Sequence, residues 1–145
     1  MKQSPELSHP APAGCGRHPI LAGYDGSAPS KHALAYAAGL ARRADRWLVI
    51  VRTWRIGGLI PAPLTRDAQA ERLRQLRAEL ADTDLTGLDV EIIVRIGDPA
   101  AELLKMAADR RADAIVIGAA RRFRHLAGVP ARLARRACCP AVVVP

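Results

Sequence analysis

The chain has 145 residues, of which 50% are hydrophobic and only 3% are aromatic, and it carries a formal net charge of +8. This length is typical of one domain, whose core has to be built from Ala, Val, Leu and Ile. No apolar run approaches the roughly 20 residues that span a bilayer, and residues 1–17 lack the apolar segment of a secretory signal. We therefore expect a cytoplasmic protein, with a disordered tail over residues 1–17 and one domain over residues 18–145.

Short apolar runs rich in Val, Ile and Leu alternate along the chain with segments of helical periodicity. Most of these runs are followed by Gly, Asp or Pro, which are typical of turns. Their near-continuous apolar character indicates strands that are covered on both faces. In chain order, the predicted strands cover residues 19–25, 47–54, 89–96, 112–118 and 140–144.

The spacing of apolar residues between these runs predicts helices. Ser27 or Ser30 can cap the first helix and Asp98 the third, each with a proline near the first turn. Glycines and prolines make residues 55–64 a loop before the second helix. The second and fourth helices are predicted over residues 65–81 and 130–137.

Strands that alternate with helices at this spacing predict right-handed crossovers and a parallel sheet. We therefore predict a doubly wound, Rossmann-like α/β fold, with five strands in the order 3-2-1-4-5 and about four helices. Ligands of such sheets bind beyond the carboxyl ends of the strands, where the strand order reverses. Asp25 is then expected to face Gly118, and it can accept a hydrogen bond from a ribose hydroxyl or an adenine amine. The alternative is an aspartate that only forms the turn.

Positive charge is concentrated near the C-terminal end, because no acidic residue follows Asp113. Such a patch can attract phosphate, nucleic acid or an acidic protein partner. The alternative is a solvated face whose last arginines stabilise the C-terminus of a helix. The arginines of this patch are Arg121, Arg122, Arg124, Arg132, Arg135 and Arg136.

The cysteines and histidines indicate no enzyme. Cys15, Cys138 and Cys139 form neither a disulfide framework nor a spaced zinc site, and no nucleophile–base arrangement can be argued from the sequence. We interpret Cys138 and Cys139 as small residues before a buried strand, with a redox role as the alternative.

Five motifs, in this order and at this spacing, resemble the universal stress protein family. They lie at residues 20–27, 51–54, 97–100, 113–118 and 139–144, and the resemblance covers residues 19–145. It implies a soluble adenine-nucleotide-binding domain linked to stress responses. It also implies a homodimer joined along the last strand, through Ala141, Val142, Val143 and Val144, and a bare apolar edge strand favours such pairing.

The ATP-binding members of this family resemble each other in a loop that reads Gly, two residues, Gly, nine residues, Gly, then Ser or Thr. Here Gly118 matches the first glycine, Arg121 stands at the second, and Ala127 and Gly128 fall at the final pair, with only five residues between Arg121 and Ala127. Glycines let backbone N–H groups approach a phosphate closely, and the hydroxyl adds a donor. We therefore predict weak or no ATP binding, the alternative being a phosphate held by arginine side chains.

The resemblance also implies which residues surround a nucleotide. Thr53 stands where ATP-binding members usually place an apolar residue against the adenine. The expected site residues are Gly23, Asp25, Thr53, Gly118, Arg121, Ala127 and Gly128. The predicted function is that of a small stress-response protein that acts by binding or regulation.

Overall fold

The computed structural model describes residues 18–54, 65–119 and 128–145. The described residues form five strands, which are β1 (Ile20–Gly23), β2 (Leu48–Trp54), β3 (Val90–Ile96), β4 (Ala114–Gly118) and β5 (Ala141–Val144). They alternate with four helices, which are α1 (Ala28–Ala44), α2 (Arg66–Glu79), α3 (Pro99–Arg110) and α4 (Val129–Arg136). The predicted tail over residues 1–17 and the predicted loop over residues 55–64 lie outside the described residues.

The five strands form one sheet in the order β3-β2-β1-β4-β5, and every neighbouring pair is parallel. The predicted fold class and strand order are confirmed. In the register of the sheet, Gly23 of β1 pairs with Val51 of β2, and Ala22 pairs with Val116 of β4. The carboxyl ends of these three strands therefore lie at the same edge, and the strand order reverses between β1 and β4.

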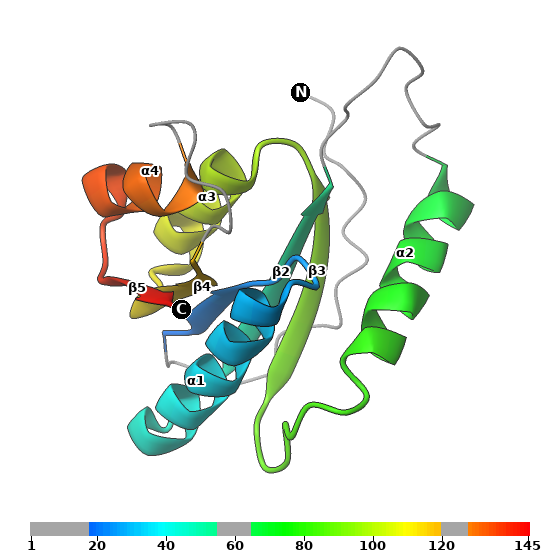
Figure 1. Ribbon diagram of the computed structural model, residues 1–145, viewed down its shortest axis with the longest axis horizontal. Coiled ribbons are helices and arrows are strands. Elements are labelled where there is room, and N and C mark those ends of the chain that lie inside the picture. Colours follow the sequence, from blue (N-terminus) through cyan, green and yellow to red (C-terminus); the bar gives the residue numbers. More distant parts are fainter. Residues whose placement is uncertain (1–17, 55–64, 120–127) are drawn as a thin grey trace.

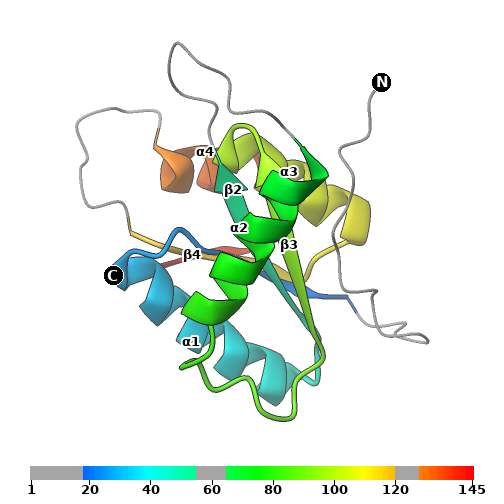
Figure 2. The same ribbon diagram turned by 90° about the vertical axis from the view of Figure 1, so that its right-hand side faces the viewer.

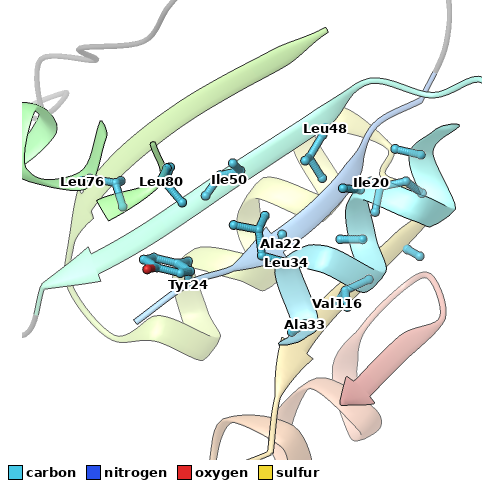
Figure 3. Packing of buried hydrophobic residues seen from close by; sticks show 14 residues of the cluster. Ile20, Ala22, Tyr24, Ala33, Leu34, Leu48, Ile50, Leu76, Leu80 and Val116 are labelled. Atoms are coloured by element: carbon cyan, nitrogen blue, oxygen red, sulfur yellow. The ribbon is translucent and has the colours of Figure 1, made fainter. Parts of the chain in front are cut away.

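Helices cover both faces of the sheet (Figure 1), with α1 on one side of the strands and α3 and α4 on the other (Figure 2). One buried cluster joins alternate residues of β1 and β2, such as Ala22 and Ile50, to α1 and to Leu76 of α2 (Figure 3). A second cluster joins the intervening residues, such as Val49, to Leu103 of α3. Burial on both faces explains why the strands are apolar at nearly every position.

Local hydrogen bonds fix where the helices begin. Ser27 caps α1 by accepting from the backbone N–H of Ser30 at 3.3 Å, and Asp98 caps α3 by accepting from the N–H of Ala101 at 2.9 Å. Both were among the predicted caps. The second helix was predicted over residues 65–81 and is shorter in the structure. It ends at Glu79, and the buried Leu80 follows as its C-cap residue.

Candidate functional site

A cavity of about 350 Å³ lies at the carboxyl edge of the sheet. Its size falls within the range of about 300–1,000 Å³ that is typical of small-molecule sites. It occupies the position at which the strand order reverses, where the sequence predicted a ligand site. The cavity is lined by Gly23, Tyr24, Asp25, Ser27, Ser30, Val51, Thr53, Pro99, Leu103, Ile117, Gly118, Ala119, Val129 and Pro130.

Three helices begin at this cavity. Ser30 belongs to the first turn of α1, Pro99 is the first residue of α3, and Val129 and Pro130 are the first residues of α4. The N-terminus of a helix carries partial positive charge and backbone N–H groups without intrahelical partners. The convergence of three such ends favours an anionic ligand.

Asp25 lies at the wall of the cavity, just beyond β1. Its Oδ1 accepts a hydrogen bond from the N–H of Ser27 at 2.9 Å, and its own N–H donates to Oγ of Ser30 at 3.3 Å. Burial acts to raise the pKa of Asp25, but the hydrogen bonds of Ser27 and Ser30 and the charge of Arg52 outweigh it, so the pKa lies below its ordinary value. One carboxylate oxygen thus holds the turn, and a carboxylate can accept further hydrogen bonds through its second oxygen.

Gly118 is required by packing at the end of β4. A Cβ built on Gly118 would lie 2.5 Å from the backbone carbon of Pro29 and 2.5 Å from the backbone nitrogen of Ser30. Real Cβ atoms do not approach other atoms so closely, so β4 can reach the first turn of α1 only with glycine at this position. This contact accounts for Gly118 without any phosphate, although the residue also lines the cavity.

Thr53 lines the cavity from β2, on the same face as Val51. It is half-buried, and it presents a hydroxyl where the family resemblance leads us to expect an apolar side chain. A hydroxyl in this place can donate or accept one hydrogen bond to a ligand.

Gly128 is the N-cap residue of α4, adjacent to the cavity residue Val129. Its φ of −60° and ψ of 155° are open to any residue, and glycine has no side chain that could cap this helix. The structure therefore brings Gly23, Asp25, Thr53 and Gly118 together around the cavity and places Gly128 beside it. Arg121 and Ala127 lie outside the described residues.

The described part of the arginine patch is engaged within the fold or lies at a helix end. Nη1 of Arg132 pairs with Oδ2 of Asp98 at 2.6 Å, which ties α4 to the capped end of α3. Arg135 and Arg136 are exposed in the last turn of α4, where cations stabilise a helix C-terminus. Residues 121, 122 and 124 of the patch lie outside the described part of the chain.

Cys138 is exposed and Cys139 is half-buried, and both are free thiols. Burial, and then the neighbouring Cys138, raise the pKa of the Cys139 thiol, whereas reactive cysteines have lowered pKa values. The expectation that a buried strand follows them is wrong. β5 is half-buried, with 43% of Val143 exposed, because it is an edge strand.

The sequence predicted that the fourth helix begins at Pro130, but it did not assign Val129 and Pro130 to the site, whereas the structure places both at the cavity. Among the described residues, no group of three His, Cys, Asp or Glu side chains could hold a metal ion. Within the same ranges, no helix has the length and apolar character that crossing a membrane requires.

Comparison with known proteins identifies this fold. The sequence profile of the universal stress protein family matches residues 16–145. A protein of this family from Burkholderia pseudomallei is 28% identical, with a TM-score of 0.63, and the match covers 88% of this chain and 96% of that one. A universal stress protein in complex with cAMP is 25% identical, with a TM-score of 0.69 and the same coverage of 88% and 96%.

A third solved structure, the universal stress protein from Archaeoglobus fulgidus in complex with dAMP, shares the fold at 21% identity, with a TM-score of 0.67 and coverage of 88% of this chain and 98% of that one. A search of curated protein sequences returned no significant match. The profile match spans nearly the whole chain, including every strand and helix described above. This chain belongs to the universal stress protein family.

Proposed function

We propose that this protein acts in stress responses by binding a small adenine nucleotide, such as a nucleoside monophosphate, in the cavity at the carboxyl edge of the sheet, and that it catalyses no reaction. The observation that carries the proposal is Asp25, whose carboxylate is kept ionised by its turn at the wall of a cavity where three helices begin. The carboxylate suits a ribose hydroxyl, and the helix N-termini suit a phosphate. Relatives in complex with cAMP and dAMP support this class of ligand.

We further propose that ATP binds weakly or not at all. Two features of the ATP-binding loop are missing from the sequence. Arg121 stands in place of the second glycine, and Gly128 stands in place of the Ser or Thr that carries the hydroxyl. Each hydrogen bond to a charged phosphate contributes about 1.5–3 kcal/mol. The loss of two such bonds lowers the affinity by roughly two to four orders of magnitude. Arginine side chains that bind the phosphates would recover part of the lost affinity, but they would lose side-chain entropy on binding.

Isothermal titration with AMP and with MgATP tests both statements. We expect AMP to bind at least as tightly as ATP, because the additional phosphates of ATP find no glycine cradle. Asp25→Asn is expected to abolish the heat of AMP binding. Asp84→Asn is the matched control, because Oδ1 of Asp84 accepts from the N–H of Thr86 at 3.1 Å in a similar turn that does not line the cavity.

A dissociation constant for ATP in the micromolar range or below would contradict weak ATP binding. Equal heats from the wild type and Asp25→Asn would contradict the assignment of the cavity. Detectable turnover of either nucleotide would contradict a purely binding role.

We also propose that two copies of the chain pair along β5. This strand pairs only with β4 in the described sheet, and 43% of Val143 is exposed on it. A bare apolar edge strand favours pairing with another chain. Light scattering is expected to give a dimer for the wild type and a monomer for Val143→Lys. A wild type that is monomeric at micromolar concentration would contradict the proposal.

A further inference from the structure

A half-buried arginine lies behind the Asp25 turn, on the opposite face of the sheet from the cavity. Arg52 stands on β2 between the cavity residues Val51 and Thr53. Successive side chains of a strand point to opposite faces, so Arg52 points toward α2. Only 15% of its side chain is exposed. Because most of this side chain is removed from water, its charge needs partners.

One set of partners belongs to the turn. The guanidinium carbon of Arg52 lies 5.8 Å from the centre of the Tyr24 ring. A Cβ built on Gly26 would lie 3.1 Å from Nη1 of Arg52, so the guanidinium packs directly against the backbone of the turn. Burial acts to raise the pKa of Asp25, while hydrogen bonds within the turn and the charge of Arg52 lower it. Arg52 therefore packs against Tyr24 and Gly26, on either side of Asp25, and acts on Asp25 by its charge without lining the cavity.

The other partner belongs to α2. Nη1 of Arg52 donates to Oε2 of Glu79 at 3.0 Å, in the last turn of α2. A Cβ built on Gly26 would lie 3.5 Å from Oε2 of Glu79, so this carboxylate also lies against the turn. Burial, and then the charge of Glu79, raise the pKa of the Tyr24 hydroxyl. Tyr24 belongs to the same buried cluster as Leu76 and Leu80 at this end of α2 (Figure 3). A polar connection and an apolar one thus run from the turn to α2, and Arg52 is central to the polar one.

We propose that Arg52 is a positioning residue that couples the Asp25 turn to α2, so that a ligand engaging Asp25 also changes how firmly α2 is held. The ligand in this inference rests on the proposed function, whereas the coupling is a property of the unliganded chain. Coupling between two sites is reciprocal, so a partner that displaces α2 changes the affinity of the cavity by the same factor. In a protein that acts by binding, this connection lets a partner that contacts α2 distinguish an occupied cavity from an empty one.

Hydrogen exchange on the unliganded protein tests the coupling. Asp25→Asn removes the charge of the turn while keeping the shape of the side chain. We expect it to speed exchange at the amides of α2 near Glu79 by about fivefold or more, the lower end of typical couplings. In an Arg52→Gln background, the same substitution is expected to cause no further change. A fivefold effect of Asp25→Asn that persists without Arg52, or no effect of Asp25→Asn in the wild type, would overturn the proposal.

Arg72→Gln is the matched control. The guanidinium carbon of Arg72 lies 5.2 Å from the centre of the Trp54 ring, and that of Arg52 lies 4.7 Å from the same ring. In the described structure, however, Arg72 does not contact the turn as Arg52 does. The effect of Asp25→Asn on α2 should therefore survive in Arg72→Gln. Its loss there would show that removal of any arginine at Trp54 breaks the connection, which contradicts a specific role of Arg52.

A second variant keeps the test decisive if Arg52→Gln does not fold. Glu79→Ala removes the carboxylate that accepts from Arg52 and so breaks the same connection from α2, and 42% of the Glu79 side chain is exposed, so the fold tolerates the change. It is expected to abolish the effect of Asp25→Asn in the same way, and a persisting effect would overturn the proposal. Addition of AMP then separates the two hypotheses. If the wild type gives no binding heat, the proposed ligand is wrong, while the exchange data on the variants still decide the coupling.

Discussion

Two helix N-termini at the cavity are built in opposite ways. α1 begins with a serine cap, with the Asp25 turn bonded to Ser27, and with the end of β4 packed against its first turn. α4 begins at Gly128, which has no side chain to cap the helix. The first end is preorganised by its own residues, whereas Gly128 has no side chain that could cap the first N–H groups of α4. The comparison teaches that hydrogen bonds and packing of the described residues define the start of α1, whereas the start of α4 lacks the side-chain cap that α1 has.

The largest expected effect is a loss of stability on replacing Gly118, which packs against the first turn of α1. Gly118→Ala introduces a Cβ 2.5 Å from the backbone of Pro29 and Ser30, and such overpacking destabilises a protein by about 1–3 kcal/mol. Urea denaturation measures the change. Gly39→Ala is the control, because among the described residues its Cβ would meet only the flexible Arg43 side chain and alanine stabilises a helix interior by about 0.5–1 kcal/mol. Equal effects of the two substitutions would show that the close approach is not required.

Gly128→Ser tests whether the N-terminus of α4 contacts a bound phosphate. The hydroxyl would supply the phosphate donor that the sequence lacks at this position. One hydrogen bond to a charged group contributes about 1.5–3 kcal/mol, so ATP affinity is expected to rise by roughly ten- to a hundredfold. Titration of both proteins with MgATP measures the ratio, and Gly128→Ala controls for the added side chain. An unchanged affinity would mean that a bound phosphate does not reach α4.

The next largest effect is the loss of stability on removing the N-cap of α1. Ser27→Ala deletes the oxygen that accepts from the N–H of Ser30 at 3.3 Å, and loss of such a cap costs about 0.5–2 kcal/mol of stability. Thermal unfolding is the measurement. The matched variant Thr65→Ala removes the equivalent cap of α2, which accepts from the N–H of Ala68 at 3.1 Å. Because α1 lies at the cavity, only Ser27→Ala is expected to weaken AMP binding as well.

The smallest effect is the pH dependence of Asp25. Its pKa in the folded state is lowered, so the ionised form contributes stability that is present above the unfolded-state pKa of about 3.9. This contribution is lost as the pH falls through the folded-state pKa. The stability difference between the wild type and Asp25→Asn should therefore be constant from pH 7 to pH 5 and decrease below about pH 4. A difference that grows on acidification would show that the turn does not favour the carboxylate.

Much of the fold could be predicted because its determinants are local. Caps such as Ser27 and Asp98 bond to backbone groups three residues away, and apolar runs report burial within one strand. The strand order followed from general rules on crossovers. The rule that ligands bind where the strand order reverses predicted that Asp25 faces Gly118, and both residues line the cavity. The residues of the predicted phosphate loop, Arg121 and Ala127, stay predictions, as do the disordered tail, the dimer and the cytoplasmic location.

What the sequence by itself determined is therefore the alternation of strands and helices, their order in the sheet and the family of the protein. Periodicity and caps act within a few residues of each other, crossover rules relate successive strands, and the family motifs are recognised by their order along the chain. Only the tertiary structure decided why Gly118 must be glycine. It also decided that Arg132 pairs with Asp98, and that Arg52 joins the Asp25 turn to Glu79. Each of these contacts joins segments that are distant in the chain. Their geometry depends on how the helices pack on the sheet, which no local pattern specifies.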